Sequence, residues 1–548
     1  MHRCLRLNEI LEIIFRFVLN NQFEDPWGFN RHLSYGRSIT PAFLPYSRGQ
    51  RSVLHLALTC RAFREPALNV LWSYLKGTGP LIKSELVLSC EASPVRAHAG
   101  FHQLVLRAAR VQMLYINDSL NNDAAYALFL ANAPQDGFLF PKLDSLAWYD
   151  RNLTSIPALN LLLPTLNSLS LDISDASFRK AVFPGLCTAI PSLKALDFVS
   201  LKALDFVSFP VTADNSSEIK FEIESLLFNY PEGLTKLSLR CCDISNGLLD
   251  VIAPWPHLTW LAFRMGSKGI PSALRVPQPF QALNTLLISC EHLSLFGSFL
   301  RSVLRTDSNP CCFGFPSLKK ITTDAHHCSP ASIWSDIFNF LIYTKLEHMS
   351  LIESCHDDHY HILSSLALHP LLARPAALAD LETLVIHTTI TIQDTDIATL
   401  ARACPRLQFI DLAMCNPPIS LYALAYLVGR CHELYNVALC LDVRLDALCA
   451  APLEDDDQVV LRPNMCLTSL HVGASPIAAA GPLDSPTAPD LMRSIPRFLH
   501  MIAPKLVKVM VLIVWPDFGR NRDRFSNWER WDKVSRVLSE MVQMDSDR

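Results

Sequence analysis

Apolar residues recur along most of this chain in a short phrase with the spacing Leu-x-x-Leu-x-Leu. Successive phrases stand 23 to 28 residues apart in many cases and 32 to 41 residues apart in others. Alternation within a phrase predicts a half-buried strand, and a period of this length is typical of leucine-rich repeats. The phrases begin at Val111, Leu143, Leu166, Leu193, Leu234, Leu258, Leu283, Leu318, Leu346, Leu381, Leu407, Leu434, Leu467 and Leu506.

Segments between the phrases carry helical periodicity. Ile397, Leu400, Ala401 and Cys404 share one apolar face, which Pro405 ends just before the next phrase. A second such face comprises Leu424, Leu427, Val428 and Cys431. One strand and one helix per repeat predict an α/β fold: a curved leucine-rich-repeat solenoid over residues 77–515, with parallel strands on its concave face and helices on its convex face. Residues 290–380 fit the pattern least well.

The first 76 residues follow a different pattern, that of three short amphipathic helices. The first has an apolar stripe of Leu7, Ile10, Leu11, Ile14, Phe15 and Val18. After an insertion at about residues 20–50, Ser52 is expected to cap a second helix, which Pro66 ends. A third helix is expected to bury Leu68, Leu71, Trp72 and Leu75.

The segments LNEILEIIFRFV and SVLHLALTCRAFREPALNVLW together resemble an F-box, although Asn8 follows Leu7 where that family commonly has proline. The resemblance is to F-box proteins with leucine-rich repeats, of the divergent fungal kind, which are substrate-recognition subunits of Skp/cullin/F-box ubiquitin ligases. It implies a Skp-type adaptor and a cullin scaffold as partners. The residues it implies for adaptor binding are Leu7, Ile10, Leu11, Ile14, Phe15, Leu58, Cys60, Phe63, Leu71 and Trp72.

An alternative role for these helices is a plain cap over the open end of the solenoid, because repeat arrays require capping. In that case the chain is a leucine-rich-repeat binding or inhibitor protein unconnected to ubiquitin. At the other end, residues 516–548 are expected to form a capping helix or tail.

Between the leucines of each phrase, the intervening side chains point to the opposite, concave face, where a protein substrate is expected to bind. Arginine and exposed aromatic residues dominate interface energies, so Trp260 with Arg240 and Arg264 is the predicted hot spot. The predicted substrate-binding residues are Lys236, Arg240, Trp260, Arg264, His387, Phe409 and Asp411; scattered surface residues are the alternative interpretation.

Composition narrows the class of protein. The net charge of −4 offers no field that would hold nucleic acid, and 50% apolar residues supply a continuous core. The longest apolar run, Val509 to Trp515, is far too short to cross a membrane. Cysteines at apolar-periodic positions indicate a reducing compartment, cytoplasmic or nuclear.

The sequence contains few arrangements of residues that are typical of a catalytic or metal-binding site. Cys355 to His361 and His326 to Cys328 gather metal-capable side chains without a zinc-finger spacing, so a polar loop is favoured over a metal site. No nucleophile elbow or phosphate loop occurs. We therefore expect neither enzyme activity nor a cofactor. The octapeptide SLKALDFV occurs twice in succession, at Ser192 to Val199 and Ser200 to Val207, which indicates a local duplication.

Overall fold

A computed structural model of the chain divides it into two compact units, residues 1–264 and 265–548, each described here by itself. The structure describes residues 8–21, 47–77, 80–81, 105–117, 140–149, 166–172, 175–190, 193–199, 213–228, 233–266, 274, 276, 279–304, 315–341, 344–353, 366–388, 390–415, 417–443, 462–472, 475, 477, 488–511 and 522–546.

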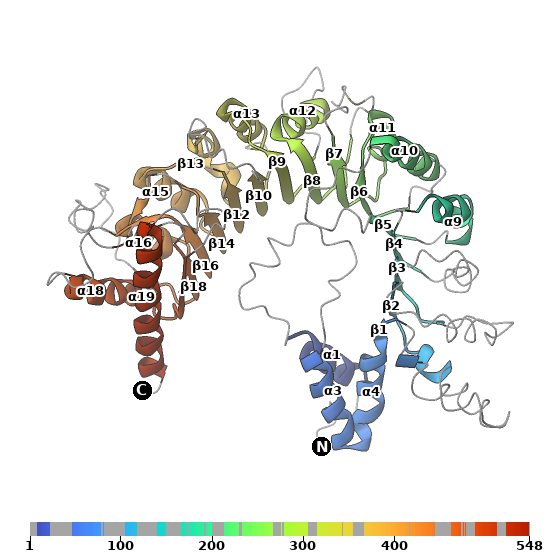
Figure 1. Cartoon of the computed structure of the whole chain (residues 1–548), viewed down its shortest axis with the longest axis horizontal. Helices are drawn as coiled ribbons and strands as arrows, with labels where there is room; N and C mark the ends of the chain where they lie inside the picture. Colours follow the sequence, from blue (N-terminus) through green and yellow to red (C-terminus); the bar gives the residue numbers. More distant parts are fainter. Residues whose placement is uncertain are drawn as a thin grey trace. The chain divides into compact units, whose positions relative to one another are not determined.

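The first unit begins with three helices and continues as parallel strands that pair in chain order, β1 through β7 (Figure 1). Its elements are α1 (Asn8–Asn21), α3 (Ser47–Thr59), α4 (Arg61–Ser73), β1 (Tyr74–Lys76), β2 (Met113–Asn117), β3 (Ser145–Tyr149), β4 (Ser168–Asp172), α9 (Ala176–Ala189), β5 (Ala195–Val199), α10 (Ala213–Phe228), β6 (Lys236–Asp243), α11 (Asn246–Ile252) and β7 (Trp260–Met265).

The second unit repeats the arrangement, with parallel pairing in the order β8, β9, β10, β12, β14, β16, β18 and β19. These strands and their helices are β8 (Thr285–His292), α12 (Leu293–Leu304), β9 (Lys320–His327), α13 (Ala331–Leu341), β10 (His348–Glu353), α14 (His369–Leu372), β12 (Thr383–His387), α15 (Asp394–Ala403), β14 (Phe409–Leu412), α16 (Leu421–Arg430), β16 (Asn436–Leu439), β18 (Ser469–His471), α18 (Ala488–Ile502), β19 (Lys508–Met510) and α19 (Arg522–Ser546).

Short extra segments complete the second unit. A 3-10 turn η5 (Pro375–Leu378) precedes β12. Two-residue strands pair in parallel beside the main sheet: β11 (Leu366–Ala367) with β13 (Ile390–Thr391), and β15 (Ile419–Ser420) with β17 (Leu441–Asp442).

Every predicted phrase coincides with a strand of the main sheets. Each phrase begins two residues before its strand, as Val111 precedes β2 at Met113 and Leu506 precedes β19 at Lys508. The first residue of each phrase is at most 3% exposed. The α/β fold with long parallel, repeated strands is thus confirmed, including β9 and β10 in the region where the pattern was weakest.

The helices between repeats bury the faces that the sequence predicts. Ile397, Leu400 and Ala401 of α15 are buried, and so are Leu424 and Leu427 of α16. Local sequence fixes where these helices begin. The side chain of Ser420 accepts a hydrogen bond from the backbone N–H of Ala423 at 3.1 Å, which caps α16, and Gln393 with Asp396 forms a capping box on α15.

Three boundaries in the helical module differ from prediction. Helix α3 begins at Ser47, so Ser52 lies inside it, and Leu75 lies in β1 and not in a helix. The break after α3 falls at Cys60, whose backbone is extended (φ −156, ψ 159), while Pro66 lies inside α4. The core of the module outweighs the single helical hydrogen bond that proline removes, because Pro66 and Ala67 are themselves buried.

At the carboxyl end, α19 packs against β19. The backbone N–H of Val509 donates to the Ser535 hydroxyl at 3.2 Å, and the Trp531 indole N–H donates to the carbonyl of Ser475 at 3.2 Å. Trp531, Val534 and Leu538 are buried. This helix therefore covers the last strand and satisfies one of its edge N–H groups.

Several predicted features lie outside the described residues. They include most of the insertion at 20–50, the second SLKALDFV copy, and the segment from Cys355 to His361. The first copy, Ser192 to Val199, contains strand β5. In the part of the chain that the structure describes, no helix combines the length and apolarity that a membrane crossing requires.

Candidate functional site

Each strand places alternate side chains on opposite faces. In β9, Ile321, Thr323 and Ala325 are buried under the helices, whereas Lys320 and Thr322 are only half-buried on the other side. Figure 1 shows α12 and α13 together on one side of strands β8 to β10. We call the side of the strands that points away from the helices the outer face. It is the face that the sequence analysis calls concave, where a protein substrate is predicted to bind.

In the first unit, the structure brings part of the predicted hot spot together. Lys236 of β6 and Trp260 of β7 are register partners; Lys236 is exposed and Trp260 is half-buried. The guanidinium of Arg264 lies 3.3 Å from the carboxylate of Asp243. A bulge between Leu239 and Asp243 displaces Arg240 from a simple pairing with Arg264. The substrate-binding role of these residues stays a prediction.

The sequence analysis did not identify a set of three buried, hydrogen-bonded polar side chains on the outer face of β3, β4 and β5. The Tyr149 hydroxyl lies 2.9 Å from the Ser170 hydroxyl, which donates to the Asp197 carboxylate at 3.1 Å. All three side chains are buried. The signal was a serine or aspartate between the leucines of consecutive phrases. Because these groups are buried and mutually bonded, they fix neighbouring strands and do not form an open binding surface.

Farther along, the predicted residues of β12 and β14 form a closed cluster. His387 Nε2 lies 2.8 Å from the Asp411 carboxylate, which also accepts from the backbone N–H of Ala413 at 3.2 Å. Phe409 and Asp411 are only 1% and 2% exposed, so both are closed off from solvent in the free chain, and their substrate-binding role stays a prediction. Burial also lowers the pKa of the nearby His471 to about 4, so its imidazole is neutral at pH 7.

The outer face of β8, β9 and β10 is more open. Thr285, Lys320, Thr322, His348 and Ser350 are all half-buried there. None of them is among the predicted substrate-binding residues, because lysine and threonine at alternating positions look like ordinary solvent-facing residues.

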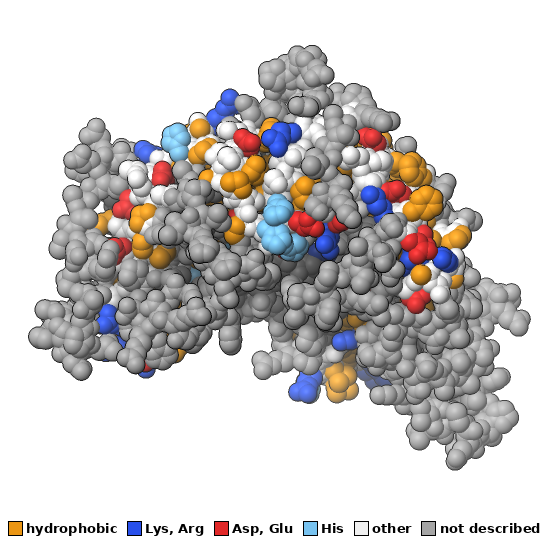
Figure 2. All heavy atoms as spheres, turned by 45° about the horizontal axis from the view of Figure 1, so that its top comes forward, with side chains coloured by type: hydrophobic (Ala, Val, Ile, Leu, Met, Phe, Trp, Pro, Cys, Tyr) orange, Lys and Arg blue, Asp and Glu red, His pale blue; other side chains and the backbone are white. Residues whose placement is uncertain are grey.

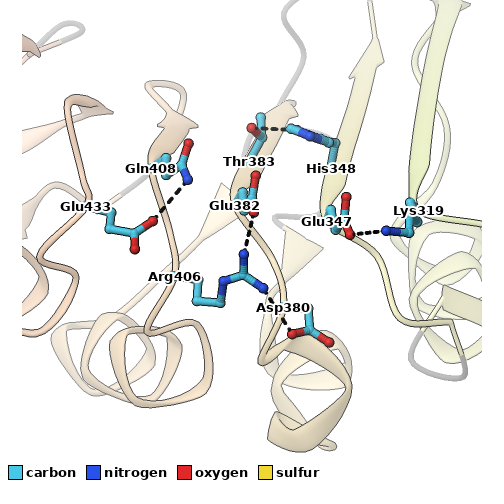
Figure 3. Close-up of polar contacts among 9 residues, drawn as sticks. All are labelled: Lys319, Glu347, His348, Asp380, Glu382, Thr383, Arg406, Gln408 and Glu433. Atoms are coloured by element: carbon cyan, nitrogen blue, oxygen red, sulfur yellow. Dashed lines mark hydrogen bonds and ion pairs between the residues drawn. The ribbon is translucent and has the colours of Figure 1, made fainter.

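A ladder of polar contacts precedes the strands of this unit (Figure 3). Lys319 Nζ donates to the Glu347 carboxylate at 2.6 Å, and His348 Nδ1 lies 2.9 Å from the Thr383 hydroxyl. Arg406 donates to Glu382 at 2.9 Å. These contacts join neighbouring repeats. The exposed ion pairs Lys319–Glu347 and Arg406–Glu382 contribute little individually to stability.

The N-terminal helices present a second candidate surface. Leu11, Phe15, Leu19, Val53 and Val70 form the core of the module, with Phe63 packed edge-on to Phe15 at a ring-centroid distance of 5.6 Å. Gly49 allows this packing, because a Cβ there would lie 2.6 Å from the carbonyl oxygen of Leu19.

Large apolar side chains remain outside that core. Ile13 and Phe17 of α1 are 67% and 63% exposed, Leu58 of α3 is 76% exposed, and Ile14 and Leu54 are also exposed. Ile13, Phe17 and Leu54 were missed, although the LEIIFRFV run has more apolar residues than one buried stripe needs. Spacings of four residues place Ile13 beside Phe17 and Leu54 beside Leu58.

The implied adaptor-binding residues divide into groups by their exposure. Leu7 lies outside the described residues, and Leu11 and Phe15 are buried in the module's own core. Ile14 and Leu58 are exposed, while the others are half-buried: Ile10, Cys60, Phe63, Leu71 and Trp72. The Arg107 guanidinium lies 5.3 Å from the Trp72 ring centroid, so Trp72 contacts the repeats themselves.

The described residues offer little reactive chemistry. They contain no group of three or more metal-capable side chains. Histidine side chains gather at one place on the face shown in Figure 2. The rings of the exposed residues His292 and His327 lie with their centroids 4.8 Å apart and their planes tilted by 31°. Cys431 is buried as the sequence predicts, Cys290 is buried too, and burial raises the pKa of both thiols to about 12. Such thiols are poor nucleophiles at pH 7.

Comparisons with known proteins add the following. No family model matches the chain, and no curated protein matches it. Among solved structures, a leucine-rich-repeat protein from Leptospira interrogans is similar, with a TM-score of 0.32 and 12% sequence identity over 80% of this chain and 99% of that chain. The repeat architecture therefore stands on the strand order and register of the chain itself.

Proposed function

We propose that this protein is a non-catalytic adaptor that binds a Skp-type subunit through α1 and α3 and recruits a protein substrate through the outer face of its repeats for ubiquitination. The observation that carries the adaptor half is the exposure of Ile13, Phe17 and Leu58 on a module whose own core is complete without them. On each helix, exposed apolar side chains lie four residues apart, Ile13 with Phe17 and Leu54 with Leu58, and exposed apolar patches mark protein interaction surfaces.

Energetics favour a partner for these side chains. Fully burying a side chain such as phenylalanine or leucine contributes about 1.5–3 kcal/mol, so three of them can supply much of the affinity of a moderate complex. The F-box resemblance names the partner class, and exposed Ile14 and Leu58 belong to both the implied binding residues and this surface.

The cap alternative also has support in specific contacts. Arg110 lies 2.7 Å from the Glu65 carboxylate, and Arg16 donates to the Gln112 side chain at 3.2 Å, so the module is bonded to the segment that precedes β2. A cap needs these contacts. It does not need the exposed apolar side chains of Ile13, Phe17 and Leu58, and for that reason we favour a module that both caps the repeats and docks a partner.

The test is a pull-down of full-length chain with a purified Skp-type adaptor, comparing wild type with a Phe17→Asp, Leu58→Asp double variant. Both positions are exposed, so the variant is expected to fold, which thermal unfolding checks. Loss of binding in the folded variant is expected. Equal capture of both proteins, or capture of neither, contradicts the adaptor half and leaves the cap alternative.

Two further variants complete that experiment. Phe15 lies two residues from Phe17 but is only 2% exposed, so Phe15→Asp is expected to unfold the module and shows how a loss of binding through unfolding appears in the thermal assay. Arg51→Asp, on an exposed polar position of α3, controls for the added charge and is expected to bind like wild type.

A further inference from the structure

Lys319 and Lys320 are adjacent in the sequence, but the first is paired with a carboxylate and the second is partly buried without one among the described residues. The Lys319 ammonium is paired with Glu347 at 2.6 Å, and this carboxylate raises its pKa. Lys320 begins β9 on the outer face, where it is half-buried, and it has no carboxylate partner among the described residues. Burial lowers the pKa of its ammonium.

The surroundings of Lys320 add hydroxyl groups and a further imidazole. Its register partners are Thr285 of β8 and His348 of β10, and Thr322 and Ser350 occupy the next outer positions of β9 and β10. The Lys320 charge helps to lower the pKa of His348, after the larger effect of burial. Glu347 and Glu382, the carboxylates that act on His348, are bonded to Lys319 and Arg406.

A partly desolvated, unpaired charge destabilises a folded chain, and such a group on a binding face is a candidate functional site. We infer that Lys320 anchors an oxyanion of the bound protein substrate, a carboxylate or a phosphate group on a peptide segment that crosses the outer face of β8 to β10. The hydroxyls of Thr322 and Ser350 lie on the same face to donate hydrogen bonds to it.

This inference rests on the substrate-binding half of the proposed function and is independent of the Skp-binding half. Lys320 lies on β9 and the helical module is a separate part of the chain. A Lys320 variant should therefore still be captured by a Skp-type adaptor, so failure of one proposal is distinguishable from failure of the other.

The experiment measures thermal unfolding of the full chain as inorganic phosphate or acetate replaces chloride at constant ionic strength. Wild type, Lys320→Arg and Lys319→Met are expected to be stabilised, and Lys320→Met to bind the anion about tenfold more weakly. Stabilisation by phosphate alone indicates a phosphorylated ligand; stabilisation by both anions indicates that a carboxylate suffices.

Two results would overturn the inference. One is an equal anion response in wild type and Lys320→Met. The other concerns the anion-free protein: if Lys320 is held for a ligand, Lys320→Met should unfold at the same temperature as wild type or higher, because it removes an unpaired charge. A clearly lower unfolding temperature would identify Lys320 as a structural group instead.

Discussion

Asn464 precedes strand β18, and its buried side chain links two neighbouring repeats. Its side-chain amide donates to the carbonyls of Val428 and Cys431 at 3.3 and 2.8 Å, at the end of α16. Its carbonyl accepts from the backbone N–H groups of Cys466 and Leu467 at 2.7 and 2.8 Å. The residue is 1% exposed, so water does not replace these partners.

Replacing Asn464 by alanine removes all four hydrogen bonds. The Cys431 carbonyl keeps a second donor, the N–H of Leu434 at 3.1 Å, whereas the N–H of buried Leu467 loses its partner. An unsatisfied buried backbone group costs about 1–3 kcal/mol, so we expect the variant to lose about 2–4 kcal/mol of unfolding free energy. Aspartate should not rescue it, because a carboxylate would face two carbonyl oxygens.

Urea unfolding of full-length chain, followed by hydrogen exchange of peptides covering β18, measures this loss. Gln408→Ala is the matched control: that side chain also bonds across repeats, to Glu433 at 3.0 Å, but in an exposed position, and its loss should change stability by at most about 0.5 kcal/mol. Equal stability of Asn464→Ala and wild type would refute the reasoning.

Three further changes test other parts of the structure. Glu222→Ala should destabilise the first unit by about 1.5–3 kcal/mol in thermal or urea unfolding, because it removes the carboxylate that bonds to buried Arg179; a loss below about 0.5 kcal/mol would argue against this pair. Burial raises the pKa of Glu353, so the folded state binds a proton more tightly than the unfolded state does. The unfolding free energy of wild type relative to Glu353→Gln should therefore fall as pH rises from about 4 through the folded pKa. A pH-independent difference between the two proteins would contradict this. A thiol reagent should modify exposed Cys466 in native protein but reach buried Cys431 only after unfolding, which mass spectrometry detects.

The repeats could be predicted because their signal is local and redundant. Fourteen phrases gave the strand positions, since an alternating apolar pattern buries one face of a strand whatever its neighbours are. Helices α15 and α16 followed for the same reason. The predicted break at Pro66 was wrong because tertiary packing of α4 outweighs a local preference.

Exposure at the candidate sites could not be read from single strands or helices. Helix α1 has apolar residues on two faces, and only its contacts with α3 and α4 decide that Phe15 is buried while Phe17 is exposed. Phe409 and Asp411 alternate like surface residues but are buried in the folded unit. In the folded chain Glu347 pairs with Lys319 and not with the adjacent Lys320. The spacing of residues in the sequence does not specify this choice of partner.

Hydrogen exchange of full-length protein with and without a purified Skp-type adaptor tests the central claim most directly. The adaptor account predicts slower exchange in peptides covering α1 and α3, with α19 and the outer face of β9 unchanged. Unchanged exchange in α1 and α3 at saturating adaptor, or protection confined to the repeats, would contradict it.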